Sequence, residues 1–195
     1  SEYTDIQCVG FIMDGNRRWA TEKGKKTLEG HKKGAETFTD IARAIRDANI
    51  PHAVFFAFST ENWKRSEEEV SYLMDLFDEF LDEADKKLAD DKEKNVHIKV
   101  VGRREDFDEK LQKRIFELDE KNKDIEADTT IWVALSYGGR AEIVDAVNKA
   151  IEVGEKVDEE SFNQHLWTAD MPDPDIIVRT SGEHRTSNFM TWKSV

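Results

Sequence analysis

The stretch 11-FIMDGNRRWA-20 decides how the fold and the site of this chain are interpreted. Three apolar residues are followed by an acid, a glycine and an amide, and then by two arginines and a tryptophan. An apolar run that ends in Asp-Gly-Asn is typical of a strand that leaves the sheet in a polar turn. It is unusual that Asp14 stands so close to Arg17 and Arg18 in a chain with a formal net charge of −13.

Apolar runs of strand length recur along the 195 residues, and segments with helical periodicity lie between them. Ser66 and Glu69 have the spacing of a capping box at the start of the predicted helix that covers 67–90. The predicted strands cover 8–13, 53–58, 96–101, 130–136 and 176–178, and the predicted helices cover 32–48, 67–90, 106–120, 140–152 and 159–166. This alternation predicts a single α/β domain with a mostly parallel central sheet flanked by helices.

The composition limits the class of protein. A net charge of −13 argues against a nucleic-acid-binding protein, which normally carries a basic face. Cys8 is the single cysteine, so no disulfide is possible within the chain, and this favours a reducing, cytoplasmic environment. The longest apolar run, 53–58, is too short to cross a bilayer, so we expect a protein that contacts a membrane at its surface at most.

Polar motifs follow four of the predicted strands, at the edge where open α/β sheets bind ligands. These motifs are 14-DGNRRWATEKGKKTLEGHKKG-34, 59-STENWKR-65, 137-YGGR-140 and 179-RTSGEHRTSN-188. Within 17–33 there are seven Lys or Arg against two Glu, which makes a positive region in an acidic chain. Arginine forks suit phosphate oxygens, so we expect an anionic ligand with phosphate or diphosphate groups. Asp14 suits such a site if it binds Mg²⁺ together with the phosphates.

Each of these motifs also has a plainer interpretation. Asp-Gly-Asn is a common turn, and His31 has the properties of a structural histidine. Tyr-Gly-Gly is typical of a tight strand-to-helix turn, and Trp19 and Trp63 are typical packing residues. For an anion-binding site, by contrast, we expect helix N-termini near His31 and Gly139 to donate further N–H groups to the ligand. The convergence of four polar motifs on one edge of the sheet favours a binding site.

Five motifs together resemble the cis-prenyltransferase family, which includes undecaprenyl diphosphate synthase and dehydrodolichyl diphosphate synthase. They are FIMDGNRRWA, EGHKKGAE, FAFSTENWKR, SYGGRAEI and DIIVRTSGEHRTSNFMTWKS, and they follow the order of the family from about Cys8 to Val195. The resemblance implies a Mg²⁺-dependent enzyme that adds isopentenyl diphosphate to an allylic diphosphate with cis double bonds. The expected product is a polyprenyl diphosphate, a precursor of lipid glycan carriers.

The resemblance also implies roles for individual residues. Asp14 is the expected metal ligand and a catalytic residue, and Asn62 is the second catalytic residue. Because an amide is a poor base, we expect the departing diphosphate to take the proton while Asn62 orients it. The expected substrate-binding residues are Gly15, Asn16, Arg17, Arg18, Trp19, His31, Ser59, Thr60, Glu61, Trp63, Arg65, Arg179, Arg185, Thr186 and Ser187.

The apolar product needs a hydrophobic tunnel, which we expect between the sheet and the two long helices at 32–48 and 67–90. Ala57, at the end of the second strand, would leave room for the first isoprene units. The motif SYGGRAEI resembles the dimer contact of the family, so a homodimer is expected.

Three features depart from the family pattern. Arg17 replaces the glycine of most bacterial members and resembles archaeal and eukaryotic ones, and Thr27 stands where many members have an arginine. The family also has a glutamate, about six residues after the tryptophan that matches Trp192, which helps to hold Mg²⁺. It would lie beyond Val195, so we expect 1–195 to lack the C-terminal segment of the family.

Two other functions remain open from the sequence. One is a non-catalytic subunit of a heteromeric prenyltransferase, although such subunits usually lose the Asp-Gly-Asn and arginine motifs that this chain keeps. The other is a Mg²⁺-dependent phosphohydrolase, which would need a nucleophile or a base for water. The chain offers no clear group for that role.

Overall fold

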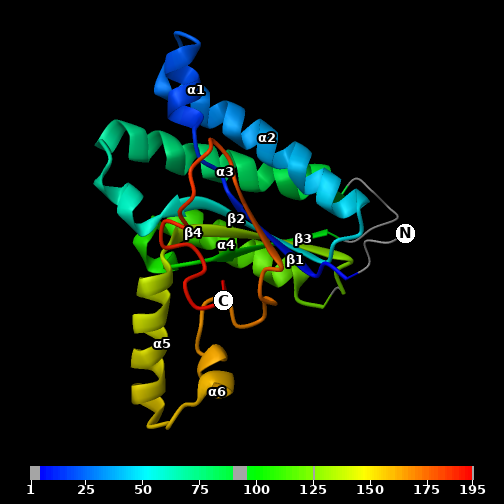
Figure 1. The fold of residues 1–195 in the computed structure, drawn as a ribbon, viewed down its shortest axis with the longest axis vertical. Coiled ribbons are helices and arrows are strands. Elements are labelled where there is room, and N and C mark those ends of the chain that lie inside the picture. The colour runs from blue at the N-terminus through cyan, green and yellow to red at the C-terminus, as the bar shows by residue number, and fades with distance from the viewer. Residues whose placement is uncertain (1–4, 90–95, 125, 195) are drawn as a thin grey trace.

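One parallel sheet forms the centre of the molecule. The computed structural model describes residues 5–89, 96–124 and 126–194. The strands are β1 (Cys8–Ile12), β2 (His52–Ser59), β3 (Val96–Val101), β4 (Thr129–Tyr137) and β5 (Ile176–Arg179). Their order is β3-β4-β2-β1-β5, and every neighbouring pair is parallel, which confirms the expected α/β fold (Figure 1).

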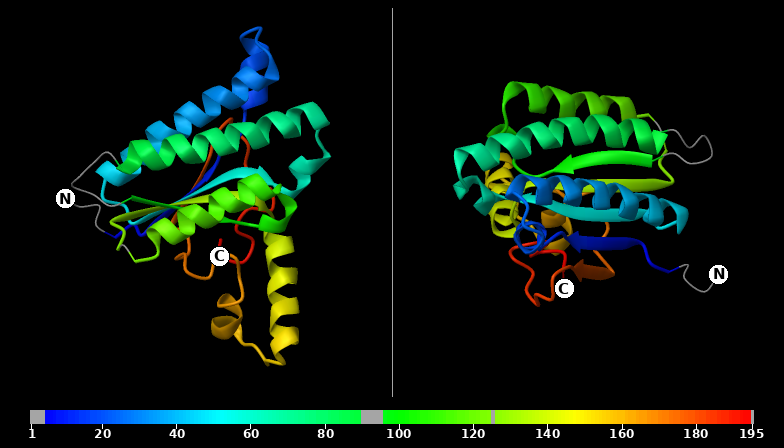
Figure 2. Two further views of the ribbon diagram at one scale, coloured as in Figure 1. Left: turned by 180° about the vertical axis from the view of Figure 1, so that it is seen from behind. Right: turned by 90° about the horizontal axis from the view of Figure 1, so that it is seen from above.

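Helices flank this sheet (Figure 2). The α-helices are α1 (Asn16–Glu22), α2 (Thr27–Asp47), α3 (Glu67–Ala89), α4 (Glu109–Asn122), α5 (Gly139–Val153) and α6 (Glu159–Asn163), and two 3₁₀ turns are η1 (Thr60–Lys64) and η2 (Arg104–Asp106). Helices α2, α3 and α4 share one hydrophobic core with the sheet. Helix α5 and the segment after β5 lie on the opposite side, and α6 packs against α5.

Alternating side chains of the strands build the two cores. Val9 and Phe55 face the long helices, and Phe38 of α2 packs on Phe55 with ring centroids 4.1 Å apart. Cys8 and Val54, which directly precede these two residues in the sequence, face the core on the other side of the sheet. All nine residues of β4 are buried, as expected for an inner strand with both faces covered.

The structure departs from the predicted elements mainly between β1 and β2. Helix α1 was not predicted, and α2 begins at Thr27, five residues before the predicted start at 32. The two helices approach closely because Gly30 of α2 lies against the backbone of Asn16. A Cβ added at Gly30 would lie 2.2 Å from the Asn16 carbonyl oxygen, so this crossing requires glycine.

In the described ranges, no helix is both long enough and apolar enough to cross a membrane.

Candidate active site

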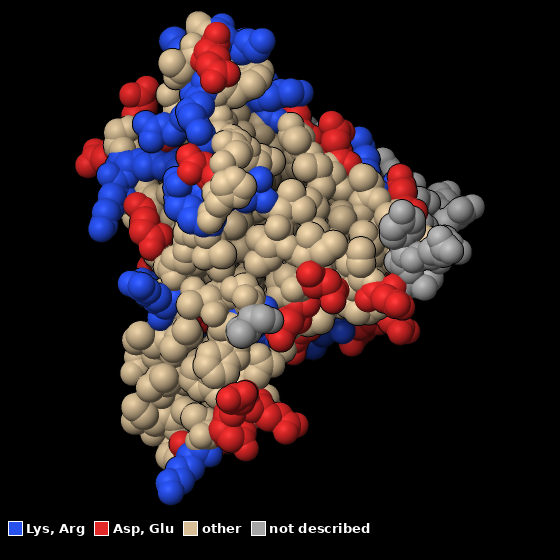
Figure 3. All heavy atoms as spheres, viewed as in Figure 1, with Lys and Arg blue, Asp and Glu red and all other residues tan. Residues whose placement is uncertain are grey.

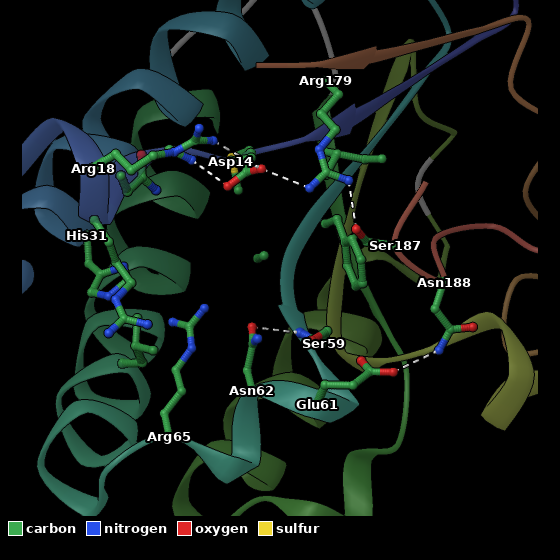
Figure 4. Close-up of a pocket in the computed structure, with 18 residues that line it drawn as sticks. Asp14, Arg18, His31, Ser59, Glu61, Asn62, Arg65, Arg179, Ser187 and Asn188 are labelled. Atoms are coloured by element: carbon green, nitrogen blue, oxygen red, sulfur yellow. Dashed lines mark hydrogen bonds and ion pairs between the residues drawn. The ribbon is translucent and has the colours of Figure 1, made fainter. Parts of the chain in front are cut away.

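A cavity of about 800 Å³ opens at the carboxyl ends of β1, β2 and β5 (Figure 4). Twelve of the predicted site residues line it, and they come from motifs that are far apart in the sequence. They are Asp14, Gly15, Asn16, Arg17, Arg18, His31, Ser59, Glu61, Asn62, Arg65, Arg179 and Ser187. Three of the four polar motifs therefore converge on this cavity as expected, whereas none of the residues 137–140 lines it.

Asp14 lies at the end of β1 and is held by an arginine from each side. Its Oδ2 lies 2.8 Å from an Nη of Arg179 and 3.6 Å from an Nη of Arg18, one turn along α1. Its Oδ1 accepts a 2.7 Å hydrogen bond from the N–H of Gly15. Burial works against the charged carboxylate, but these bonds and charges still lower the pKa of Asp14 below its usual value. Asp14 is therefore an anion at neutral pH.

Gly15 is required by the turn between β1 and α1. Its φ of +96° lies in the left-handed region, and a Cβ at this position would lie 1.7 Å from the Oγ of Ser181. The segment that follows β5 thus lies directly against the start of α1. Only glycine tolerates this positive φ and also leaves room for the side chain of Ser181.

A second group of charges forms around Glu69 of α3, which was not among the predicted site residues. Its Oε1 lies 3.0 Å from Nε2 of His31, 3.0 Å from an Nη of Arg65 and 3.9 Å from Nε of Arg17. Burial works against its charged form, but the bond to His31 and the two arginines lower the pKa of Glu69. One ionised carboxylate therefore holds three cationic or polar side chains of the cavity wall.

His31 lies inside α2, not at its N-terminus as predicted, because α2 begins one turn earlier. Burial lowers the pKa of His31, and this outweighs the bond to Glu69, while Arg65 and Arg17 lower the pKa further. An ionised carboxylate only accepts hydrogen bonds, so the proton of the neutral imidazole lies on Nε2. The position of His31 is thus fixed by Glu69 rather than by a helix end.

The N-terminus of α5 also differs from the prediction. The N–H of Gly139 donates to the carbonyl of Asn188 at 2.7 Å, and the N–H of Arg140 donates to Oδ1 of Asn188 at 2.9 Å. These donors are therefore already used within the protein. The glycines allow close packing instead, since a Cβ at Gly139 would lie 2.2 Å from Oγ1 of Thr191.

On the far side of the cavity, the end of β2 and the segment after β5 contribute polar groups. Oδ1 of Asn62 accepts a 3.1 Å hydrogen bond from the N–H of Ser59, so the NH₂ of this amide is the group left for a ligand. Oγ of Ser187 accepts a 2.7 Å bond from Arg179. Figure 4 shows both groups around the same hollow as Asp14 and Arg65.

Five predicted site residues do not line the cavity: Trp19, Thr60, Trp63, Arg185 and Thr186. Trp63 packs edge-on against Phe58, and its Nε1–H donates to Ser136 at 2.8 Å, so it has the contacts of a packing residue. Arg185 is exposed and forms an ion pair with Glu183. Its backbone carbonyl accepts a hydrogen bond from Arg179.

The charge distribution favours an anionic ligand. Four arginines line the cavity against the carboxylates of Asp14 and Glu61. Figure 3 shows Lys and Arg gathered on the upper part of this face, over α1, while Asp and Glu dominate its lower edge. Among the residues that the structure describes, no cluster of three or more His, Cys, Asp or Glu could hold a metal alone. A single carboxylate fits Mg²⁺ that takes its other ligands from phosphates and water.

Comparison with known proteins identifies the family. The sequence profile described as "Putative undecaprenyl diphosphate synthase" matches residues 12–195. An isoprenyl transferase of Thermotoga maritima is 44% identical over 193 residues, which cover 96% of this chain and 81% of that protein. The chain belongs to the undecaprenyl diphosphate synthase family. It is accordingly a cis-prenyltransferase, and its elements match the solved structures of such enzymes.

Two further relatives support this assignment. The ditrans,polycis-undecaprenyl-diphosphate synthase ((2E,6E)-farnesyl-diphosphate specific) of Micrococcus luteus is 40% identical, over 95% of this chain and 76% of that protein. The structure of lavandulyl diphosphate synthase from Lavandula x intermedia, in complex with dimethylallyl diphosphate, has a TM-score of 0.89 at 30% identity and covers 96% of this chain and 83% of that one. Neither comparison supports the archaeal likeness that Arg17 suggested.

Proposed function

We propose that this cis-prenyltransferase condenses isopentenyl diphosphate with an allylic diphosphate and builds a polyprenyl diphosphate at the cavity beside β1. The observation that carries this proposal is that arginines line two sides of one cavity, three of them on one side and one on the other. Arg17, Arg18 and Arg65 lie toward α1 and α3, and Arg179 lies at the end of β5. Two diphosphates need cationic side chains on two sides of a cavity, whereas the single phosphate ester of a phosphohydrolase needs them on one side.

The allylic diphosphate would bind between the start of α1 and Arg65. Asn16, Arg17 and Arg18 offer amide and guanidinium donors on this side, and Gly15 lets the ligand come close to the backbone. As the bond to the allylic carbon breaks, negative charge develops on the departing diphosphate. Fixed donors such as Arg65 stabilise that charge without reorganisation.

Asp14 is the residue that would hold Mg²⁺. The ion, when bound, would neutralise part of the diphosphate charge. The carboxylate of Asp14 is ionised and lies between Arg18, on the side proposed for the allylic diphosphate, and Arg179, on the side proposed for isopentenyl diphosphate. Arg179 and Arg18 pair with this carboxylate, so Mg²⁺ would compete with them for Asp14 when it binds together with diphosphate.

Isopentenyl diphosphate would bind on the other side, near Arg179 and Ser187, with Arg185 and Thr186 in the same segment. Asn62 lies between the two groups. Since its Oδ1 is already bonded to Ser59, it presents donors to the substrates. This supports an orienting role for Asn62 and leaves the proton to the departing diphosphate.

The growing chain would extend between α2, α3 and β2. A small apolar pocket of about 60 Å³ lies there, and it shares Met13, Asn16, His31, Ala57 and Leu73 with the main cavity. Its deeper wall is formed by Phe38, Phe77 and Phe80. A prenyl chain needs more room than this, so the helices would move apart as the product lengthens.

A homodimer through α5 is part of the proposal. Val144, Val147 and Ile151 are exposed by 60%, 42% and 69%, and they share one face of this helix. Figure 3 shows the corresponding uncharged area at the lower left. A second copy would cover these valines and isoleucine, and gel filtration that gives a monomer would contradict the dimer. Peripheral contact with a membrane would help an apolar product to leave the enzyme.

One assay tests the proposed function. The protein is incubated with farnesyl diphosphate, labelled isopentenyl diphosphate and Mg²⁺, with a parallel sample in excess EDTA. We expect labelled polyprenyl products that EDTA abolishes. Free phosphate without prenyl products would favour a phosphohydrolase, and no turnover with intact substrate binding would favour a non-catalytic subunit.

A further inference from the structure

Asn188 connects the segment after β5 to the end of β4. Its backbone carbonyl and its Oδ1 accept the N–H groups of Gly139 and Arg140, at 2.7 and 2.9 Å. Its φ is +64°, in the left-handed region that asparagine tolerates better than most residues. These bonds fix the side chain in one orientation, with its NH₂ turned to the cavity.

The same side chain also reaches the turn that follows β2. Its Nδ2–H donates to Oε1 of Glu61 at 3.1 Å, and both residues line the cavity (Figure 4). Burial works against the charged form of Glu61, but hydrogen bonds from its own N–H and from Asn188 lower its pKa. Glu61 belongs to η1, the turn that also holds Asn62 and that Arg65 follows. Asn188 thus fixes the turn that carries two of the proposed catalytic and binding groups.

Ser187, the residue before Asn188, completes a connection across the cavity. Oγ of Ser187 accepts from Arg179, and Arg179 in turn forms the 2.8 Å ion pair with Asp14. Residues 187 and 188 therefore contact the end of β5 on one side and the segments that follow β2 and β4 on the other, and Arg179 extends this connection to Asp14. Gly138 leaves room for this arrangement, since a Cβ there would lie 2.9 Å from Nδ2 of Asn188.

We propose that Asn188 is a positioning residue that couples the two diphosphate sites through Glu61. This inference rests on the proposed function, which assigns one diphosphate to Arg179 and Ser187 and the other to the side of Arg65. A ligand that fixes the segment at Ser187 also fixes Asn188, and through Glu61 it fixes the turn at 60–64. Binding at either site then favours binding at the other, and the effect is reciprocal.

An exchange of donor and acceptor tests this bond. Asn188→Asp keeps an oxygen for the N–H of Arg140 but places a second carboxylate against Glu61. Glu61→Gln removes the acceptor charge. In the double variant the introduced amide can donate to the introduced carboxylate, so the bond is restored with reversed direction. Asn49→Asp is the matched control, because Asn49 also has a positive φ (+57°) but is exposed and lies between α2 and β2.

The measurement is the dissociation constant of isopentenyl diphosphate with and without farnesyl S-thiolodiphosphate, a slowly ionising analogue, in the presence of Mg²⁺. For the unchanged protein we expect the analogue to tighten binding by about 5-fold or more. Each single variant should reduce this factor toward one, while the double variant should return to within about twofold of the unchanged protein. Asn49→Asp should keep the full factor. In turnover, the single variants should raise the KM of isopentenyl diphosphate more than they lower kcat.

Three results would overturn the inference. The first is that both ligands bind to the unchanged protein but the analogue does not change the dissociation constant of isopentenyl diphosphate. The second is an unchanged factor in Asn188→Asp and Glu61→Gln. The third is a double variant that remains as impaired as the single ones, which would assign the effect of Asn188 to its bonds with α5. Failure of the proposed function is distinct, because the unchanged protein would then form no prenyl product.

Discussion

Nε2 of His31 lies 3.0 Å from Oε1 of Glu69, and this bond joins α2 to α3 across the wall of the cavity. The two side chains are 8% and 11% exposed, so water competes little with their interaction. The same carboxylate oxygen accepts from Arg65. Glu69 therefore sets the position of Arg65, which we assign to the departing diphosphate, and of His31 beside it.

Glu69→Gln should lower kcat for condensation by about 10²-fold, because displaced donors no longer match the departing diphosphate. Loss of one negative charge should at the same time leave the binding of inorganic diphosphate unchanged or tighter. Steady-state kinetics and calorimetry with diphosphate measure the two effects. Glu36→Gln, at an exposed ion pair of α2, is the control and should behave like the unchanged protein. Equal losses of binding and kcat would contradict a positioning role for Glu69.

The titration of His31 gives a second prediction. Burial lowers its pKa below the ordinary value of about 6.5, so it should be neutral at pH 7 in the free protein. NMR titration of the imidazole should show this directly. Because Glu69 raises the pKa of His31, Glu69→Gln should lower it further. A native pKa below the unfolded one means that the contribution of neutral His31 to stability is present above about pH 6.5 and is lost as the pH falls toward the native pKa. A measured pKa above 6.5 in the free protein would contradict this account.

The sequence predicted the strands well because each is an apolar run bounded by polar turns. Helix α1 was missed because its seven residues hold only Trp19 and Ala20 as apolar positions, which is too few for a helical period. The close approach of α1 to α2 depends on Gly30, and the importance of this glycine is visible only from its contact with Asn16 in the structure. The order β3-β4-β2-β1-β5 also needed the structure, since strand pairing is a long-range property.

The site was predicted where a motif directly followed a strand. Asp14, Asn62 and Arg179 were found in this way, and all three line the cavity. Glu69 was missed because its spacing from Ser66 predicted a capping box. Its N–H does donate to Oγ of Ser66 at 3.3 Å, but its carboxylate turns to His31 and Arg65 instead. A local pattern cannot reveal a partner that lies 38 residues away.

Ala57→Leu should shorten the products. Ala57 lines both the main cavity and the apolar pocket between α2 and α3, so a larger side chain would close the entrance to that pocket. Chromatography of radiolabelled products measures the chain length. Ala44→Leu, at an exposed position of α2, is the control. Products of unchanged length from Ala57→Leu would show that the chain does not extend past this residue.

Glu142 gives a prediction about stability. It is 1% exposed, and it accepts hydrogen bonds from the hydroxyl of Tyr137 at 2.5 Å and from the Oγ1 and N–H of Thr168 at 2.7 and 3.0 Å. Glu142→Ala should reduce the free energy of unfolding by about 3 kcal/mol, since it leaves these buried donors without an acceptor. The thermal midpoint should fall by roughly 6–12 °C. Glu152→Ala, at an exposed position of the same helix, should change little.

Asn62→Ala separates ionisation of the allylic substrate from condensation. Because Oδ1 of Asn62 is bonded to Ser59, its NH₂ is the part that can orient a diphosphate or the condensing carbon unit. We expect condensation to fall by about 10²-fold, as for loss of one fixed donor, while ionisation falls much less. Release of diphosphate from farnesyl diphosphate in the presence of an unreactive isopentenyl analogue measures ionisation alone. If ionisation fails as badly as condensation, Asn62 acts on the departing diphosphate and its assignment to the proton transfer is wrong.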